Sequence, residues 1–270
     1  MATTEFVRVE RSGNGVVVVT LDRPERRNAM AFDVMVPFRE RIEAIGRDND
    51  CRVVVITGNG GSFCAGADLE DPGMVPDIDG LTLPTIALRS IGLLDHALLA
   101  LRTLPQPVIA AVNGPAIGGG FCLALAADIR IAGTDAVFRA AGICNGLTAA
   151  ELGLSYLLPR AIGASRAAEI MLSGRDVGAE EAARIGLVSR VVEYGGVVGE
   201  AVVLAERIGE YSRPGVELTK RMLWASLDSA SLESHMSHEG TAQLFVRLTT
   251  KNFEEAIRAR KEKRKPVFLD

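Results

Sequence analysis

Four short segments along the chain, three of them almost entirely apolar, predict β-strands. They are rich in β-branched residues, which favour a strand over a helix. The run at 52–57 is nearly all apolar, as expected for a strand that is covered on both faces. The four runs lie at residues 16–21, 52–57, 108–112 and 128–132.

Helical periodicity appears between these strands. Apolar residues at 34, 38, 42 and 45 are spaced by four and three, which predicts an amphipathic helix over 30–47. Helices are also predicted over 88–101 and 121–127, and the Pro- and Gly-rich stretch 71–85 predicts a surface loop. Strands that alternate with helices predict an α/β core with largely parallel sheets.

The pattern changes after residue 196, where no further strong strand is found. Helical periodicity continues through segments at 197–211, 214–226, 231–249 and 252–265. We therefore expect an α/β core over 1–196 and a helical C-terminal region over 197–270.

Composition and charge argue against several classes of partner. The chain has 270 residues, is 48% hydrophobic and carries a formal net charge of −4. That length supports a sizeable core, and the absence of basic bias argues against nucleic acid or an anionic membrane surface as a partner. Neither a signal-peptide pattern nor a run of about 18 apolar residues is found, so a cytoplasmic location and no membrane span are predicted. The four cysteines lack zinc-type spacing, and no metal site is predicted.

Two glycine-rich turns follow buried strands. The first fails the dinucleotide pattern because Phe63 stands where the third glycine belongs, and the second, Gly118–Gly120, lacks the Lys-Ser/Thr of a phosphate loop. Glycines allow close approach to the backbone, and a helix that starts at such a turn presents free N–H groups. Two strand-to-helix turns can supply one N–H each to a single oxyanion. Tight strand–helix packing is the alternative explanation.

Five segments, in order and spanning nearly the whole chain, resemble the enoyl-CoA hydratase/isomerase (crotonase) superfamily. They are Leu21-Asp-Arg-Pro-Glu-Arg-Arg-Asn-Ala-Met30, Phe63-Cys-Ala-Gly-Ala-Asp-Leu69, Val112-Asn-Gly-Pro-Ala-Ile-Gly-Gly-Gly120, Leu158-Pro-Arg160-x-x-Gly163 and Glu262-Lys-Arg-Lys-Pro-Val-Phe268. The resemblance implies a spiral of repeated ββα units, with C-terminal helices that mediate homotrimers, often paired into hexamers. It implies an acyl-CoA thioester as substrate, and no separate cofactor.

The resemblance also implies roles for single residues. The N–H groups of Ala67 and Gly119 match those that hold the thioester oxygen. Three residues match positions that meet the adenine end of coenzyme A, namely Ala65, Asp68 and Leu69. Two match basic positions near the 3′-phosphate and adenosine, namely Arg26 and Lys263, and the latter reaches a neighbouring subunit's ligand in some members. For Asp68, capping of a helix is the alternative.

The chain departs from the hydratases at both of their catalytic glutamates. Cys122 stands two residues after the third glycine, and Gly142 stands four residues after Phe138. Glu151, flanked by small and apolar residues, is the remaining candidate acid/base, with helix capping or an arginine partner as the alternative. For Cys122, buried packing is favoured over a reactive thiol. The sequence thus predicts single-acid isomerisation rather than hydration, and the alternative is an acyl-CoA-binding protein with little or no catalysis.

Overall fold

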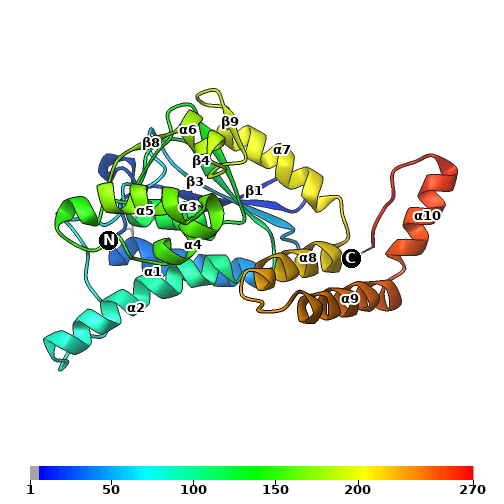
Figure 1. Ribbon diagram of the computed structural model, residues 1–270, viewed down its shortest axis with the longest axis horizontal. Coiled ribbons are helices and arrows are strands. Elements are labelled where there is room, and N and C mark those ends of the chain that lie inside the picture. The colour runs from blue at the N-terminus through cyan, green and yellow to red at the C-terminus, as the bar shows by residue number, and fades with distance from the viewer. Residues whose placement is uncertain (1–5, 270) are drawn as a thin grey trace.

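A six-stranded sheet forms the centre of the molecule in the computed structural model, which describes residues 6–269 (Figure 1). Its strand order is β1-β2-β3-β4-β6-β9. β1 pairs antiparallel with β2, and each later pair is parallel. The strands are β1 (Val7–Ser12), β2 (Val16–Leu21), β3 (Val53–Gly58), β4 (Val108–Val112), β6 (Ile129–Gly133) and β9 (Arg190–Val192).

A second, three-stranded sheet has the order β5-β7-β8. Its strands are β5 (Ala116–Ile117), β7 (Val137–Arg139) and β8 (Val177–Gly178). β4 is followed by β5, and β6 by β7, so consecutive strands pass from the large sheet to the small one. This repeated passage is the spiral that the resemblance implies.

Helices cover both faces of the large sheet. The helices are α1 (Phe32–Gly46), α2 (Leu83–Arg102), α3 (Gly119–Ala126), α4 (Leu154–Ile162), α5 (Ala164–Ser173), α6 (Ala179–Arg184), α7 (Val197–Gly209), α8 (Arg213–Ser226), α9 (Leu232–Thr249) and α10 (Asn252–Glu262), with 3-10 turns η1 (Pro24–Arg26) and η2 (Ile143–Asn145). In β2, Val17 and Val19 pack into the main core with α1 to α5, whereas Val16 and Val18 pack against α7. Burial on both faces explains why the strands are continuous apolar runs.

The four predicted strands are confirmed within one residue at each end. The expectation of a helix after the first glycine turn was wrong, because residues 68–82 form no helix or strand and α2 begins only at Leu83. Five of the described strands were not predicted. The strands β5, β7, β8 and β9 have two or three residues, too few to show a periodicity, and the edge strand β1 is largely polar and exposed.

Helix α2 is long and apolar enough to cross a membrane by length and composition alone, with a mean hydropathy of 1.2 over 18 residues. The apolar run is interrupted by Arg89 and Asp95. The second half of α2 buries Ala97, Leu98 and Leu101 in the main core, so this half belongs to the α/β body.

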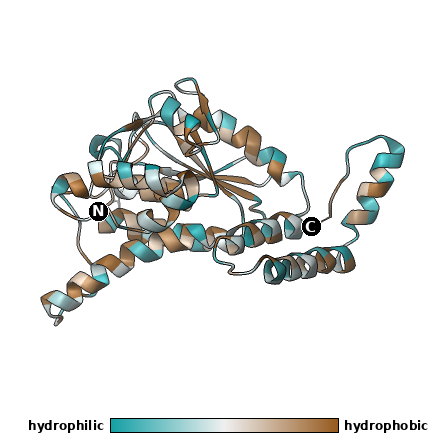
Figure 2. Ribbon diagram, viewed as in Figure 1, coloured by the Kyte–Doolittle hydropathy of each residue, from teal (hydrophilic) through white to brown (hydrophobic). Residues whose placement is uncertain are grey.

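The last two helices, α9 and α10, extend away from the sheet, whereas α7 packs on it (Figure 1). α8 and α9 lie side by side as an antiparallel pair, and α10 stands apart from the α/β body. The strands β2, β3 and β4 are almost entirely hydrophobic, whereas α8 to α10 alternate hydrophobic and hydrophilic residues (Figure 2). A division between a core over 1–196 and an oligomerisation region over 197–270 stays a prediction.

Candidate active site

The two glycine turns are tied together by main-chain hydrogen bonds. The N–H groups of Phe63 and Cys64 donate to the carbonyl of Pro115, both at 3.1 Å, and the N–H of Ile117 donates to Cys64 O at 3.0 Å. A Cβ on Gly120 would lie 2.1 Å from Cys64 O. Only glycine fits there, so this glycine is required for the close approach of the two turns.

The N–H of Ala67 is left free by a short extended stretch. Met30 N–H donates to Gly66 O at 2.7 Å, and Asp68 N–H donates to Met30 O at 3.1 Å. In extended backbone, successive peptide groups point to opposite sides. The N–H of Ala67 is therefore turned away from Met30, and no described residue accepts a hydrogen bond from it.

The N–H of Gly119 is the second free donor. Gly119 is the first residue of α3, and the first helical bond runs from Cys122 N–H to Gly118 O at 3.1 Å. The N–H of Gly119 has no partner within its helix, as is general for a first turn. A Cβ on Gly66 would lie 3.3 Å from Gly119 N, so the turn that carries Ala67 reaches the start of α3. The structure brings these two predicted residues together.

Glu151 lies at the same place. Its Oε1 is 3.5 Å from the position that a Cβ on Gly118 would occupy. The side chain is half-buried, and this burial raises the pKa of Glu151 above its ordinary value. Among the described residues it has no ion-pair partner, since burial is the single cause of its pKa shift, and α4 begins without a side-chain cap. Glu151 therefore neither caps a helix nor pairs with an arginine.

The two positions at which the hydratases carry catalytic glutamates are occupied here by the buried residues Cys122 and Gly142. Cys122 is fully buried, and its Sγ lies 3.5 Å from the main-chain oxygen of Glu151. Burial first, and the nearby Glu151 carboxylate second, raise the pKa of the Cys122 thiol far above its usual range, which agrees with packing rather than reactivity. A Cβ on Gly142 would lie 2.2 Å from Thr148 O, so no side chain fits there without a backbone shift.

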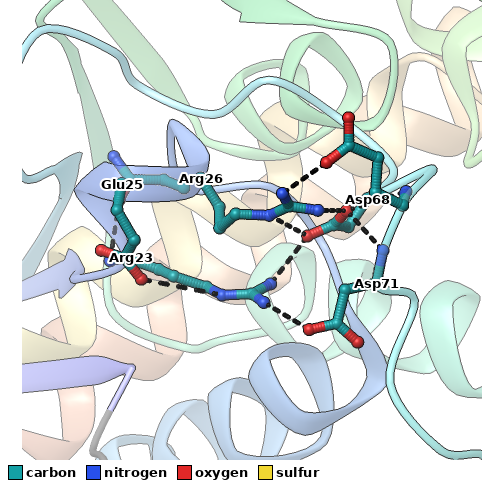
Figure 3. Close-up of polar contacts among 7 residues, drawn as sticks. Arg23, Glu25, Arg26, Asp68 and Asp71 are labelled. Atoms are coloured by element: carbon teal, nitrogen blue, oxygen red, sulfur yellow. Dashed lines mark hydrogen bonds and ion pairs between the residues drawn. The ribbon is translucent and has the colours of Figure 1, made fainter.

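A buried ion cluster anchors the residue after Ala67 (Figure 3). The Asp68 carboxylate accepts from Arg23 Nη1 at 2.9 Å and from Arg26 Nε and Nη2 at 3.1 and 2.6 Å. It also accepts from the N–H groups of Glu70 and Asp71, at 3.1 and 2.9 Å. Asp68 therefore organises a loop and caps no helix. The hydrogen bond from Arg26, as the largest cause, holds the pKa of Asp68 well below its usual range.

Arg23 was not among the residues predicted from the sequence. It lies in the Leu21–Met30 segment that carries the resemblance, and its side chain is 7% exposed. A charge buried to this degree needs a partner, which Asp68 provides. The signal that could have identified Arg23 is an arginine two residues after the end of an apolar strand.

The remaining predicted residues lie at different distances from the two turns. Ala65 and Leu69 belong to the first turn and its continuation, and Leu69 is 74% exposed. Arg26 joins this group through Asp68 and also contacts Glu70 at 2.6 Å. Lys263 follows α10, which stands far from α3 in the same chain (Figure 1). The structure does not bring Lys263 to the other predicted residues.

Two adjacent main-chain donors with one half-buried carboxylate define a class of site that stabilises negative charge on an oxygen and moves a proton nearby. The model of one family, enoyl-CoA hydratase/isomerase, matches residues 11–270. The chain belongs to this family, the crotonase family, and is an enzyme of the enoyl-CoA hydratase/isomerase type.

Individual relatives agree with this assignment. A "probable enoyl-CoA hydratase" of Mycobacterium tuberculosis is 62% identical over 269 residues, which cover 100% of this chain and 94% of the relative. The crystal structure of a "probable enoyl-CoA hydratase/isomerase" from Mycobacterium abscessus is 62% identical, with a TM-score of 0.94 and 98% of each chain covered. A "monofunctional enoyl CoA isomerase" from M. smegmatis is 56% identical, with a TM-score of 0.73, covering 86% of this chain and 99% of that one. The predicted crotonase fold is confirmed.

Proposed function

We propose that the protein isomerises the double bond of an enoyl-CoA thioester, with Glu151 as the single proton carrier. The observation that carries this proposal is the place of the Glu151 carboxylate beside Gly118, next to the free N–H of Gly119. The closed positions at Cys122 and Gly142 leave no second carboxylate to activate water. The name of the 56% identical isomerase from M. smegmatis supports the same choice.

The proposed reaction needs one base that returns its proton. Glu151 removes a proton from the carbon next to the thioester carbonyl, and the electron pair moves onto the carbonyl oxygen. The N–H groups of Ala67 and Gly119 bind the resulting enolate oxygen. Loss of one such donor lowers the rate about a hundredfold or more in enzymes of this kind. Protonated Glu151, whose proton exchanges with solvent, then delivers a proton to the far end of the former double bond, and the carbonyl re-forms.

The coenzyme A moiety would lie along the first turn. Ala65, Asp68 and Leu69 would contact the adenine, with the Asp68 side chain held inward so that its main chain is the contacting part. Arg26 would face the 3′-phosphate, and Lys263 would come from a neighbouring subunit. We place the protein in the cytoplasm and expect a homotrimer or hexamer.

The test is turnover of a panel of enoyl-CoA thioesters in deuterated water by wild-type protein and by Glu151→Gln. We expect isomerised product with deuterium at the carbon that Glu151 protonates, and exchange at the carbon next to the carbonyl as the reaction reverses. We also expect a loss of at least a hundredfold in kcat for Glu151→Gln because the base is gone. Glu193→Gln is the control, since Glu193 is exposed in a turn outside the site and should not matter.

A hydrated product would contradict the proposal. Tight binding of thioesters by wild-type protein and Glu151→Gln alike, without turnover or exchange in either, would favour the acyl-CoA-binding alternative. The observation that favours this binding alternative is the absence of both hydratase glutamates.

A further inference from the structure

The main chain of Glu151 is held by two donors from two different helices. Leu154 N–H, at the start of α4, donates to Glu151 O at 2.8 Å. The Cys122 thiol, in α3, donates to the same oxygen at a Sγ···O distance of 3.5 Å. The second contact therefore links α3, which begins at Gly119, to the turn that carries the Glu151 carboxylate.

That turn has an unfavourable backbone. Leu152 has φ of +45° and Gly153 has φ of +82°, so two successive residues are left-handed. A left-handed leucine is unfavourable and persists only where its surroundings enforce it. The Leu152 side chain packs 3.4 Å from the position that a Cβ on Gly119 would take. The turn is thus pressed against the start of α3.

The Cys122 thiol can act only as a proton donor in this place. It is fully buried, and its pKa is raised far above its usual range, so it stays protonated. A neutral thiol in contact with a carbonyl oxygen is a weak hydrogen-bond donor. It occupies the position at which the hydratases carry a catalytic glutamate.

We propose that Cys122 is a positioning residue for Glu151: its thiol holds the main-chain carbonyl of Glu151 and thereby fixes the carboxylate beside the N–H groups of Ala67 and Gly119. The inference deepens the proposed isomerase function and rests on it. The hydratase acid has been replaced by a group that orients the remaining acid. The thiol itself neither touches substrate nor transfers a proton.

The test compares Cys122→Ser, which keeps a donor of similar size, with Cys122→Ala, which removes it. For Cys122→Ala we expect kcat to fall about tenfold with KM within about twofold, because the base is misplaced while thioester binding is kept. Cys122→Ser should stay within about threefold of wild type. The acidic limb of the rate–pH profile should move in Cys122→Ala and not in Cys122→Ser, since a shifted carboxylate is differently solvated.

A double-mutant cycle separates this role from general packing. In the Glu151→Gln background, Cys122→Ala should cause no further loss in the residual proton exchange, because its effect passes through Glu151. Equal losses in Cys122→Ser and Cys122→Ala, or full additivity with Glu151→Gln, would overturn the proposal. Thermal unfolding of each variant shows whether it folds.

A crystal structure of Cys122→Ala gives a readout that is independent of turnover. We expect the main chain at 151–153 to shift away from α3. An unshifted turn with an unmoved carboxylate would overturn the positioning role even if the enzyme is active. Absence of turnover in wild-type protein would instead overturn the proposed function, and the shift of the turn would still be measurable.

Discussion

At the scale of single residues, the site depends on main-chain groups whose neighbours fix their direction. The N–H of Ala67 is free because Gly66 and Asp68 on either side are both bonded to Met30. Asp68 is in turn held by Arg23 and Arg26 (Figure 3). The side chains of Arg23, Arg26 and Asp68 therefore hold the main chain that directs the free N–H of Ala67.

Asp68→Asn should destabilise the fold. Arg23 and Asp68 side chains are 7% and 3% exposed, and removal of one partner leaves a buried charge without compensation. We expect a loss of about 2 kcal/mol in the free energy of unfolding at neutral pH. Thermal or denaturant unfolding measures it. The matched control is Asp71→Asn, because Asp71 contacts the same Arg23 but is 64% exposed, and it should cost less than about 1 kcal/mol.

The destabilisation by Asp68→Asn has a defined pH dependence. The pKa of folded Asp68 is lowered from its ordinary value. The stabilisation is therefore complete above the unfolded pKa, near 3.9, and is lost as pH falls toward the folded pKa. The difference in melting temperature between wild type and variant should be full at neutral pH and shrink in acid. A difference that grows on acidification would contradict the role of the ionised carboxylate.

At the scale of elements, close contacts between turns decide which chemistry the site can hold. α3 begins beside the first turn because Gly120 allows contact with Cys64 O, and the 142–148 loop closes because Gly142 allows contact with Thr148 O. The first contact brings the two N–H donors together. The second removes the space that a hydratase glutamate would need.

Gly142→Ala should destabilise the protein although the new side chain is small. Its Cβ would meet backbone, which cannot rotate away as a flexible side chain would. We expect a loss of about 1–3 kcal/mol in the free energy of unfolding. Gly199→Ala is the control, because a Cβ there meets open space within α7 and should raise stability by about 0.5–1 kcal/mol. A neutral Gly142→Ala would show that the loop is free to open.

The four central strands of the large sheet, β2, β3, β4 and β6, could be predicted from the sequence because burial on both faces favours apolar runs, whereas the edge strands β1 and β9 were missed. The candidate site was found through segments around Ala67, Gly119 and Glu151, and the structure brings these three together. The ion cluster of Arg23 with Asp68 was missed, because it is formed by ion pairs between segments about 45 residues apart, which periodicity does not encode. The short strands β5, β7 and β8 were missed for want of length.

At the scale of the whole molecule, the C-terminal helices offer surface for assembly. Large apolar side chains on α9 and α10 are exposed, namely Leu232, Met236, Leu244, Phe245, Leu248, Phe253 and Ile257. A surface of this kind on a helical arm favours contact with another copy of the chain. Lys263, which ends α10, would then lie near the coenzyme A of a neighbouring subunit rather than of its own.

A mixing experiment tests whether sites are shared between subunits. Glu151→Gln would lack the base, and Lys263→Ala would bind thioester weakly, so each alone should turn over little at low substrate concentration. When the two are co-expressed, one chain supplies Glu151 and its neighbour supplies Lys263. Random assembly of equal amounts should restore roughly a quarter of wild-type activity, because one site in four combines both intact residues. Light scattering of the mixture reports whether trimers or hexamers form.

The controls follow from the geometry of a shared site. Separately purified variants that are mixed without subunit exchange should show no gain, because neither supplies the missing group to the other. If Lys263 instead acted within its own chain, co-expression would also give no gain, since each site would lack either the base or the lysine. That outcome, in a preparation shown to contain mixed oligomers, would mean that α10 folds back onto its own α/β body in solution.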